Sequence, residues 1–261
     1  MQLVTADMEE GVAIITLNRP DVLNALSQEL MRSLDGVLDD VVADDRARAV
    51  VITGAGKAFC AGGDLFEFAA LYDNGAAKLL EALEFNQRVF EKLEAIPVPV
   101  VAAVNGVAVA GGLELVLCCD VVVAAASARL GDGHANYSIL PTGGSTARLQ
   151  RKIPPNIAMH LLFSGKLHPA QEFMNWGLVN KVVSDPDVRY QAVSLARAYA
   201  RHSRHVLGAI KRLTLSNTLP VGELARSELS EFADYANLPD LADGFAKFTA
   251  RRRDFDKVQT R

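Results

Sequence analysis

Two kinds of apolar pattern alternate along the first half of the chain. Short runs rich in β-branched residues predict buried strands. These runs cover residues 12–17, 49–53, 100–104 and 120–126. Between them, apolar residues recur at helical spacing after Ser27, a candidate N-cap, over 76–95, and from Gly111 to Cys119. Continuous apolar strands joined by helices indicate an α/β fold with parallel pairing and both sheet faces covered.

After Gly143 the pattern changes to helical segments that follow one another. We expect them at about 143–152, 155–163, 169–176, 187–201, 203–216, 220–236 and 240–252. No long linker and no repeat of fixed period divides the chain. The sequence therefore predicts an α/β core over residues 1–195, followed by a helical C-terminal region over 196–261.

Composition and charge exclude several classes of protein. Hydrophobic residues make up 50% and charged residues 22%, as in an ordinary globular chain. The longest apolar run, Val98 to Val104, is far shorter than the ~20 residues that span a bilayer. The first ten residues lack the basic start of a signal peptide, so we expect a cytoplasmic protein without a membrane partner. A net charge of −4 argues against a nucleic-acid partner.

The cysteines and histidines do not form a recognisable metal or redox motif. Cys60, Cys118 and Cys119 are an odd number without C-x-x-C spacing, and small-residue packing is the simplest role for Cys60. His202 and His205 are expected to share a helix face, but no acidic or cysteine ligand accompanies them. We expect no metal.

Three common catalytic motifs fail. The stretch Gly54 to Lys57 resembles a phosphate loop, but Val51 stands at the required glycine and Ala58 at the required Ser or Thr. Phe59 stands at the third glycine of a dinucleotide motif, and no G-x-S-x-G occurs. The sequence therefore offers no motif in favour of a P-loop NTPase, a nicotinamide dehydrogenase or a serine hydrolase.

Two glycine-rich turns remain, and each follows a predicted buried strand. They cover residues 59–64 and 105–114. Glycine lets a ligand approach the backbone closely, and a glycine pair that opens a helix leaves unpaired N–H groups. Two such groups from separate turns can hold one oxygen as it becomes an oxyanion. Tight turns packed for structural reasons are the alternative.

These turns belong to a longer series of segments that carries a resemblance. The series comprises Ile15–Pro20, Asn24–Ser27, Thr53–Leu65, Pro99–Asp120, Ala128–Gly131, Pro141–Gly144, Trp176–Val183 and Asp243–Phe255. In this order, and over nearly the whole chain, it resembles the crotonase family, also called the enoyl-CoA hydratase/isomerase family. The resemblance implies a spiral of ββα units and a helical C-terminal region that forms homotrimers, which often pair into hexamers. It implies an acyl-CoA substrate and no cofactor, since CoA is part of the substrate.

The resemblance also implies which residues bind the thioester. The backbone N–H groups of Gly63 and Gly111 would form the oxyanion hole. The pantetheine and thioester path would be lined by Ala61, Asp64 and Leu65, with Ala25 near the CoA end. We expect basic residues near the CoA phosphates, either Arg251 to Arg253 or Lys57.

Glu114 lies three residues after Gly111, in the first turn of its predicted helix. An acidic residue there can simply complement the N–H groups of its own helix. In the family pattern a Glu at this position orients or activates water beside the thioester.

The second acid–base position departs from the family pattern. Family hydratases read Gly-x-Pro-Glu where this chain reads Gly131 to His134. His134 can deliver a proton to the α-carbon, bind a polar group of the acyl chain, or be a non-catalytic replacement. If the stretch is extended, Asp132 and His134 point the same way and Asp132 can orient the imidazole. We place Asp132, Tyr137 and Pro141 among the substrate-binding residues.

The leading function is therefore an enoyl-CoA hydratase that acts through an enolate. Glu114 would handle water and His134 would protonate the α-carbon. Double-bond isomerisation, C–C hydrolysis and decarboxylation share the enolate and stay open, as does a non-catalytic acyl-CoA-binding protein. The sequence does not identify the acyl group.

Overall fold

The computed structural model describes residues 2–216 and, beyond them, 223, 226–228, 230, 232, 234, 238–241 and 243. The chain divides into two compact units, Met1–Arg201 and His202–Arg261. In the second unit the helix α9 (Arg204–Leu215) is described. Arg251 to Arg253, and most of the expected segments at 220–236 and 240–252, lie outside the described residues.

The larger sheet of the first unit contains the long buried strands. Its order is β1 (Val4–Glu9), β2 (Val12–Leu17), β3 (Ala49–Gly54), β5 (Val100–Val104), β7 (Val121–Ala125) and β10 (Lys181–Val183). β1 pairs antiparallel with β2, and every other neighbouring pair is parallel. All residues of β3 and β5 are buried, as continuous apolar runs predict. β1 was not predicted because it has a single fully buried position.

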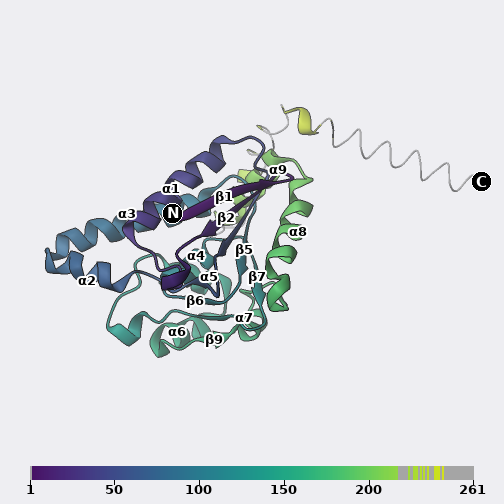
Figure 1. Ribbon diagram of the computed structural model, residues 1–261. Coiled ribbons are helices and arrows are strands. Elements are labelled where there is room, and N and C mark those ends of the chain that lie inside the picture. Colours follow the sequence, from purple (N-terminus) through teal and green to yellow (C-terminus); the bar gives the residue numbers. More distant parts are fainter. Residues whose placement is uncertain are drawn as a thin grey trace, which may run out of the picture. The chain divides into compact units, whose positions relative to one another are not determined.

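Four short strands form a second, smaller sheet. Its order is β4 (Ala58–Cys60), β6 (Val107–Val109), β8 (Arg129–Gly131) and β9 (His168–Pro169). The pairs β3–β4, β5–β6 and β7–β8 each place one strand in the large sheet and the next in the small one. Figure 1 labels β5 of the large sheet and β6 of the small one. This repetition confirms the predicted spiral of ββα units. Strands of two or three residues are too short for periodicity to reveal.

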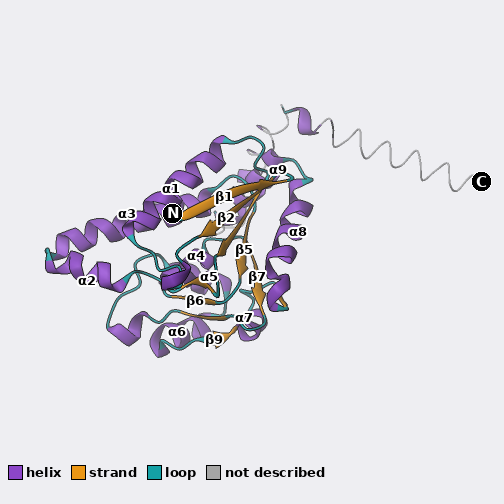
Figure 2. Cartoon of the chain, in the orientation of Figure 1, coloured by secondary structure: helices purple, strands orange, loops and turns teal. Residues whose placement is uncertain are grey.

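Helices surround the two sheets (Figure 2). Those of the first unit are α1 (Gln28–Ala43), α2 (Leu65–Asp73), α3 (Ala76–Ala95), α4 (Gly111–Leu117), α5 (Ser145–Lys152), α6 (Pro155–Ser164), α7 (Ala170–Trp176) and α8 (Val188–Ala200), with 3₁₀ turns η1 (Pro20–Val22), η2 (His134–Tyr137) and η3 (Asp185–Asp187). The Ser27 hydroxyl accepts a hydrogen bond from the Leu30 amide at 3.2 Å, so Ser27 caps α1 as predicted. α2 was not predicted. It buries no residue and therefore shows no apolar stripe.

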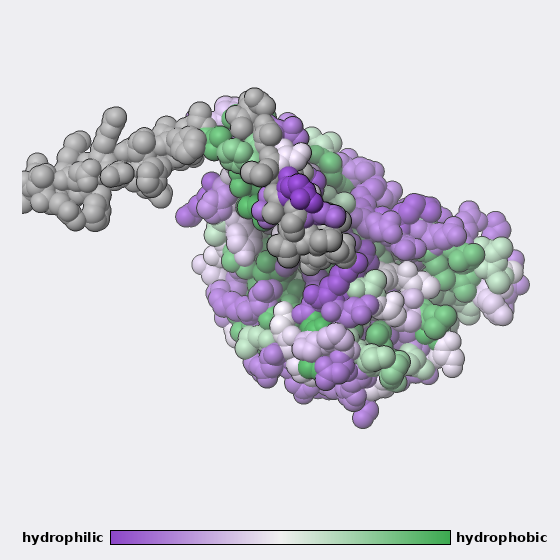
Figure 3. Space-filling view, turned by 180° about the vertical axis from the view of Figure 1, so that it is seen from behind, coloured by the Kyte–Doolittle hydropathy of each residue, from purple (hydrophilic) through white to green (hydrophobic). Residues whose placement is uncertain are grey.

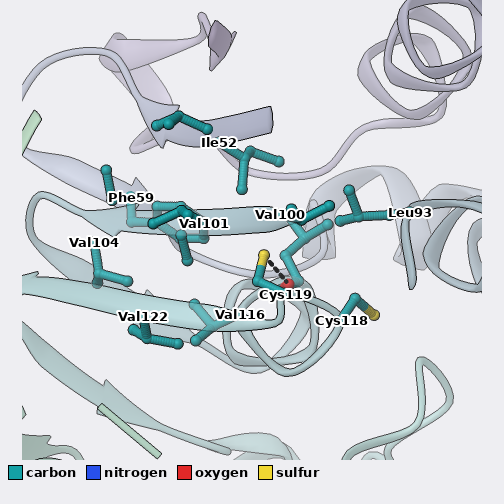
Figure 4. Packing of buried hydrophobic residues seen from close by; sticks show 14 of the residues in the cluster. Ile52, Phe59, Leu93, Val100, Val101, Val104, Val116, Cys118, Cys119 and Val122 are labelled. Atoms are coloured by element: carbon teal, nitrogen blue, oxygen red, sulfur yellow. Dashed lines mark hydrogen bonds between the residues drawn. The ribbon is translucent and has the colours of Figure 1, made fainter. Parts of the chain in front are cut away.

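The core fills the space between the large sheet and its helices. Figure 4 shows Val100, Val101 and Val104 of β5 packed near Val116 of α4. The three cysteines are buried and free, and burial raises the pKa of Cys60 to about 12. Cys60 is therefore a packing residue and not a thiolate nucleophile. No helix among the described residues has the length and apolar character that a bilayer crossing requires.

Two glycines give a matched test of this packing. A Cβ on Gly106 would overlap the carbonyl oxygen of Lys57, whereas a Cβ on Gly36, in the middle of α1, meets nothing within 4 Å. We expect Gly106→Ala to destabilise the protein by about 1–3 kcal/mol, because backbone must move. Gly36→Ala should stabilise it by about 0.5–1 kcal/mol, since alanine is the better helix former.

Urea unfolding of the two variants measures both changes. Equal stability of Gly106→Ala and the native protein would contradict the close approach of residues 57 and 106.

Candidate active site

Three parallel strands end side by side at one edge of the small sheet. Cys60 of β4 pairs with Ala108 of β6, and Val109 pairs with Gly131 of β8. The carboxyl ends of parallel strands meet at the same edge. The segments that leave these strands, 61–64, 110–114 and 132–134, are therefore neighbours although they are far apart in sequence.

The amide of Gly63 is turned away from the chain that pairs with it. Leu26 and Gly63 form a parallel bridge, in which the Leu26 N–H donates to the Gly62 carbonyl at 2.8 Å and the Asp64 N–H donates to the Leu26 carbonyl at 3.1 Å. Backbone groups alternate in direction along an extended strand. The Gly63 N–H consequently faces the side opposite Leu26.

The amide of Gly111 lies next to that of Gly63. Ala110 has φ 53° and ψ −118°, an unusual conformation for alanine, and it turns the chain sharply from β6 into α4. A Cβ on Gly111 would lie 3.5 Å from the Gly63 nitrogen. Neither amide donates a hydrogen bond to a group in the described part of the chain. Two neighbouring backbone amides thus have no acceptor in the described part of the chain.

The loop before α1 holds the first glycine turn in place. The Arg19 guanidinium pairs with Asp64 at 3.2 Å and donates to the Ala25 carbonyl at 2.7 Å. The Asp64 carboxylate also accepts a hydrogen bond from the Glu67 amide and so caps α2. The carboxylate of Asp64 and the carbonyl of Ala25 therefore have structural partners, and contact of either residue with substrate stays a prediction.

Glu114 is a buried carboxylate, with 3% of its surface exposed. It does not cap its own helix. Its Oε1 instead accepts a hydrogen bond from the Ser145 amide, at the start of α5, at 3.2 Å. Burial raises the pKa of Glu114, and the opposing effects of the His134 charge and of the Ser145 and Gly143 amides do not cancel it. A carboxyl with a raised pKa binds a proton more readily than an exposed one, which suits a general acid–base group.

His134 is held by the fully buried Asp132. Its Nδ1 lies 2.9 Å from Asp132 Oδ1, and its backbone N–H donates to the same oxygen at 3.3 Å. Burial alone lowers the pKa of His134, but the hydrogen bond and charge of Asp132, together with the charge of Glu114, outweigh it and the pKa is raised. Asp132 thus favours the charged imidazole. It binds Nδ1 and does not bind Nε2.

Asp132 and His134 contact each other through a tight turn, and not through the extended backbone that the sequence suggested. Gly133 has φ 73° and η2 begins at His134, so the stretch is a tight turn and is not extended. The assumption of an extended stretch is therefore wrong, although the pairing it suggested is present. The physical reason is the Asp132 carboxylate, which accepts from the His134 backbone and closes the turn.

The remaining predicted residues differ in burial and in backbone contacts. Ala61 is half-buried and its amide donates to the Leu23 carbonyl at 2.9 Å. Leu65 and Tyr137 are exposed over 40% and 69% of their surface, and Pro141 is half-buried. Lys57 is exposed. No cluster of three or more His, Cys, Asp or Glu side chains in the described part of the chain is arranged to hold a metal ion.

One part of the site was missed in the sequence. The turn at residues 143–145 supplies the hydrogen-bond donors to Glu114, yet no role was assigned to it. The adjacent glycines Gly143 and Gly144 were a visible signal, because paired glycines mark close approaches of backbone.

Comparison with known proteins gives a consistent result. The sequence model of the enoyl-CoA hydratase/isomerase family matches residues 7–257. The short-chain-enoyl-CoA hydratase of Clostridium acetobutylicum is 31% identical over 96% of this chain and 95% of its own length. The 1,2-epoxyphenylacetyl-CoA isomerase of Escherichia coli is 34% identical over 97% of both chains. The crystal structure of an enoyl-CoA hydratase from Bacillus anthracis has a TM-score of 0.91 and 31% identity, and covers 96% of this chain and 97% of that one.

The Asp132–His134 pair makes a prediction about titration. Asp132→Asn keeps the shape and the accepting oxygen but removes the charge, so the pKa of His134 should fall. Proton NMR of the imidazole ring measures it. Glu172→Gln, which removes the acidic partner of His168, is the matched control and should leave the His134 titration unchanged. An unchanged His134 titration in Asp132→Asn would refute the assigned role of Asp132.

Proposed function

The chain belongs to the enoyl-CoA hydratase/isomerase family, the crotonase family, and from that membership and its site we propose that it hydrates the C2–C3 double bond of an enoyl-CoA thioester. The observation that carries the proposal is the pair of unpartnered amides, Gly63 and Gly111, beside the buried Glu114. This arrangement supports an oxyanion hole next to an acid–base group.

In the proposed reaction the thioester oxygen accepts hydrogen bonds from both amides. Negative charge grows on this oxygen as water attacks C3, and fixed donors stabilise that charge without reorganising. Because the two amides belong to the segments that directly follow β4 and β6, their spacing depends on the register of these strands and not on a flexible side chain. The enolate is thereby stabilised in place.

Two side chains move the protons. Glu114 takes a proton from the attacking water, and the water oxygen bonds to C3. His134 gives a proton to C2, so the enolate collapses to the 3-hydroxyacyl thioester. The raised pKa of each group suits its role, because His134 must begin charged and Glu114 must accept a proton from water. Transfer of the proton from Glu114 back to His134, through solvent, restores the starting state.

Double-bond isomerisation is the second candidate. It uses the same enolate but needs one base that removes a proton and returns it at another carbon. The absence of a second Glu, whose place His134 occupies, favours this reading, and one relative is named an isomerase. C–C hydrolysis, decarboxylation and non-catalytic acyl-CoA binding stay as further alternatives.

We extend the proposal to assembly and location. Large apolar side chains remain exposed on the first unit, and Figure 3 shows apolar groups between polar ones over its surface. Phe66, Leu140 and Phe163 are exposed over 92%, 80% and 74% of their surface. We propose a homotrimer or a hexamer, as the family resemblance implies, in which subunit contacts would cover part of this apolar surface. A cytoplasmic location and the absence of a separate cofactor stay predictions.

A screen of acyl-CoA thioesters with mass-spectrometric detection tests the reaction. We expect a gain of one water by an enoyl-CoA. Glu114→Gln should lower kcat by ~10²–10⁴ with CoA binding retained, because the base is lost while shape and hydrogen bonding stay. Glu172→Gln should keep native turnover. A panel that yields no turnover at all would favour the non-catalytic alternative.

His134→Ala separates hydration from isomerisation. If His134 protonates C2, kcat of the variant should fall, whereas the exposed His160→Ala should not change it. His134→Glu restores the family pair and should raise the hydration of short, simple enoyl-CoAs. Unchanged turnover in His134→Ala, with turnover lost in Glu114→Gln, would reject the two-group mechanism and support an isomerase.

Light scattering tests the assembly. At micromolar concentration we expect a mass about three times, or six times, the 28.1 kDa of one chain. A stable monomer would rule out the trimer-based assembly.

A further inference from the structure

Arg148 lies behind the turn that contacts Glu114, in α5. Its guanidinium makes a two-point pair with Glu94 of α3, with Nε donating to Oε1 at 3.0 Å and Nη2 donating to Oε2 at 2.7 Å. The third nitrogen, Nη1, donates to the carbonyl of Gly143 at 2.7 Å. All three guanidinium nitrogens are therefore bound within the protein, and the Arg148 side chain is only 11% exposed.

The turn that Arg148 holds is the one that contacts the Glu114 carboxylate. The amide of Ser145 donates to Glu114 Oε1 at 3.2 Å, and a Cβ on Gly143 would overlap Glu114 Oε2. Gly144, between them, has φ 100°, a conformation that favours glycine. Three contacts thus join the Glu94 carboxylate on α3 to the Glu114 carboxylate on α4. They are the Glu94–Arg148 pair, the hydrogen bond from Arg148 to Gly143 and the hydrogen bond from Ser145 to Glu114.

We propose that Arg148, fixed by Glu94, is a positioning residue that holds the Gly143–Ser145 turn against Glu114 and so sets the orientation of that carboxylate. Arg148 is not a catalytic residue, since its donors are used on Glu94 and Gly143. Planar, two-point pairing is what makes Arg suited to the task, because a Lys at this place would keep the charge and lose the fork.

The charges around Glu114 allow positioning to be distinguished from simple electrostatics. The charges of Asp132 and His134 act on Glu114 from the β8 side, the charge of Arg148 acts on it from α5, and Glu94 pairs with Arg148. Through space alone, removing the negative charge of Glu94 lowers the pKa of Glu114. If instead Glu94 acts by fixing Arg148 and the turn, its removal weakens the amide hydrogen bonds to the carboxylate and raises that pKa. The two explanations predict opposite signs.

The experiment compares Arg148→Lys and Glu94→Gln with the native protein. The Glu114 carboxyl is titrated directly by isotope-edited infrared spectroscopy, with Glu114→Gln to assign its band. We expect its pKa to rise in both variants. On the acid side of the pH profile, kcat/KM should fall about tenfold, with KM little changed. The matched control is Glu9→Gln, which removes a surface carboxylate that pairs with Arg189 and Arg197. It should leave the pKa of Glu114 unchanged.

The outcomes separate this inference from the proposed function on which its kinetic arm rests. A raised Glu114 pKa in both variants supports positioning, even if no acyl-CoA is turned over. An unchanged pKa in Arg148→Lys, or a lowered one in Glu94→Gln, overturns it, even if the enzyme is an active hydratase. Circular dichroism and melting temperature identify any variant that fails to fold. If Arg148→Lys fails, Glu94→Gln alone decides by its sign.

Discussion

The parallel register of β4, β6 and β8 is the constraint on which the candidate site depends. These strands have three residues each, yet their carboxyl ends bring Gly63, Gly111 and Asp132 to one sheet edge. Each ββα unit contributes one strand to the small sheet, so the spiral itself supplies three chemically different segments to one place. A shift of one residue in any pair would turn an amide from the shared site to the opposite side.

The site lowers the free energy of unfolding because it buries charged groups. Glu114 and Asp132 are buried carboxylates, and in the described chain Asp132 Oδ2 has no hydrogen-bond partner. Burial of a charged group is unfavourable unless other groups compensate it. Here the compensation is local, through His134 for Asp132 and through the amides of the 143–145 turn for Glu114. The same compensation fixes the direction in which each acid–base group points.

A second set of contacts keeps the backbone of the site rigid without touching its chemistry. Asn24 is fully buried with φ 58°, and its side chain accepts from the Arg19 amide and donates to the carbonyls of Ala55 and Ala58. Through Arg19 this loop is tied to Asp64, next to Gly63. The segments at 15–20 and 24–27, which carry part of the family resemblance, therefore stabilise the backbone of the site.

The sequence by itself determined the alternation of strands and helices, because β3 and β5 are continuously buried apolar runs and α3 is long enough to show helical periodicity. It also determined the two glycine turns and the position of Glu114, since glycine pairs and a lone acidic residue in an apolar helix are visible without neighbours. It did not reveal β1 or α2, which bury little, nor the short strands β4, β6 and β8. Only the tertiary structure decided that Glu114 accepts from Ser145, that Asp132 reaches His134 through a turn, and that Arg148 stands behind Gly143. These contacts depend on the directions of side chains and on backbone conformation, and no pattern of hydrophobic and polar positions encodes them.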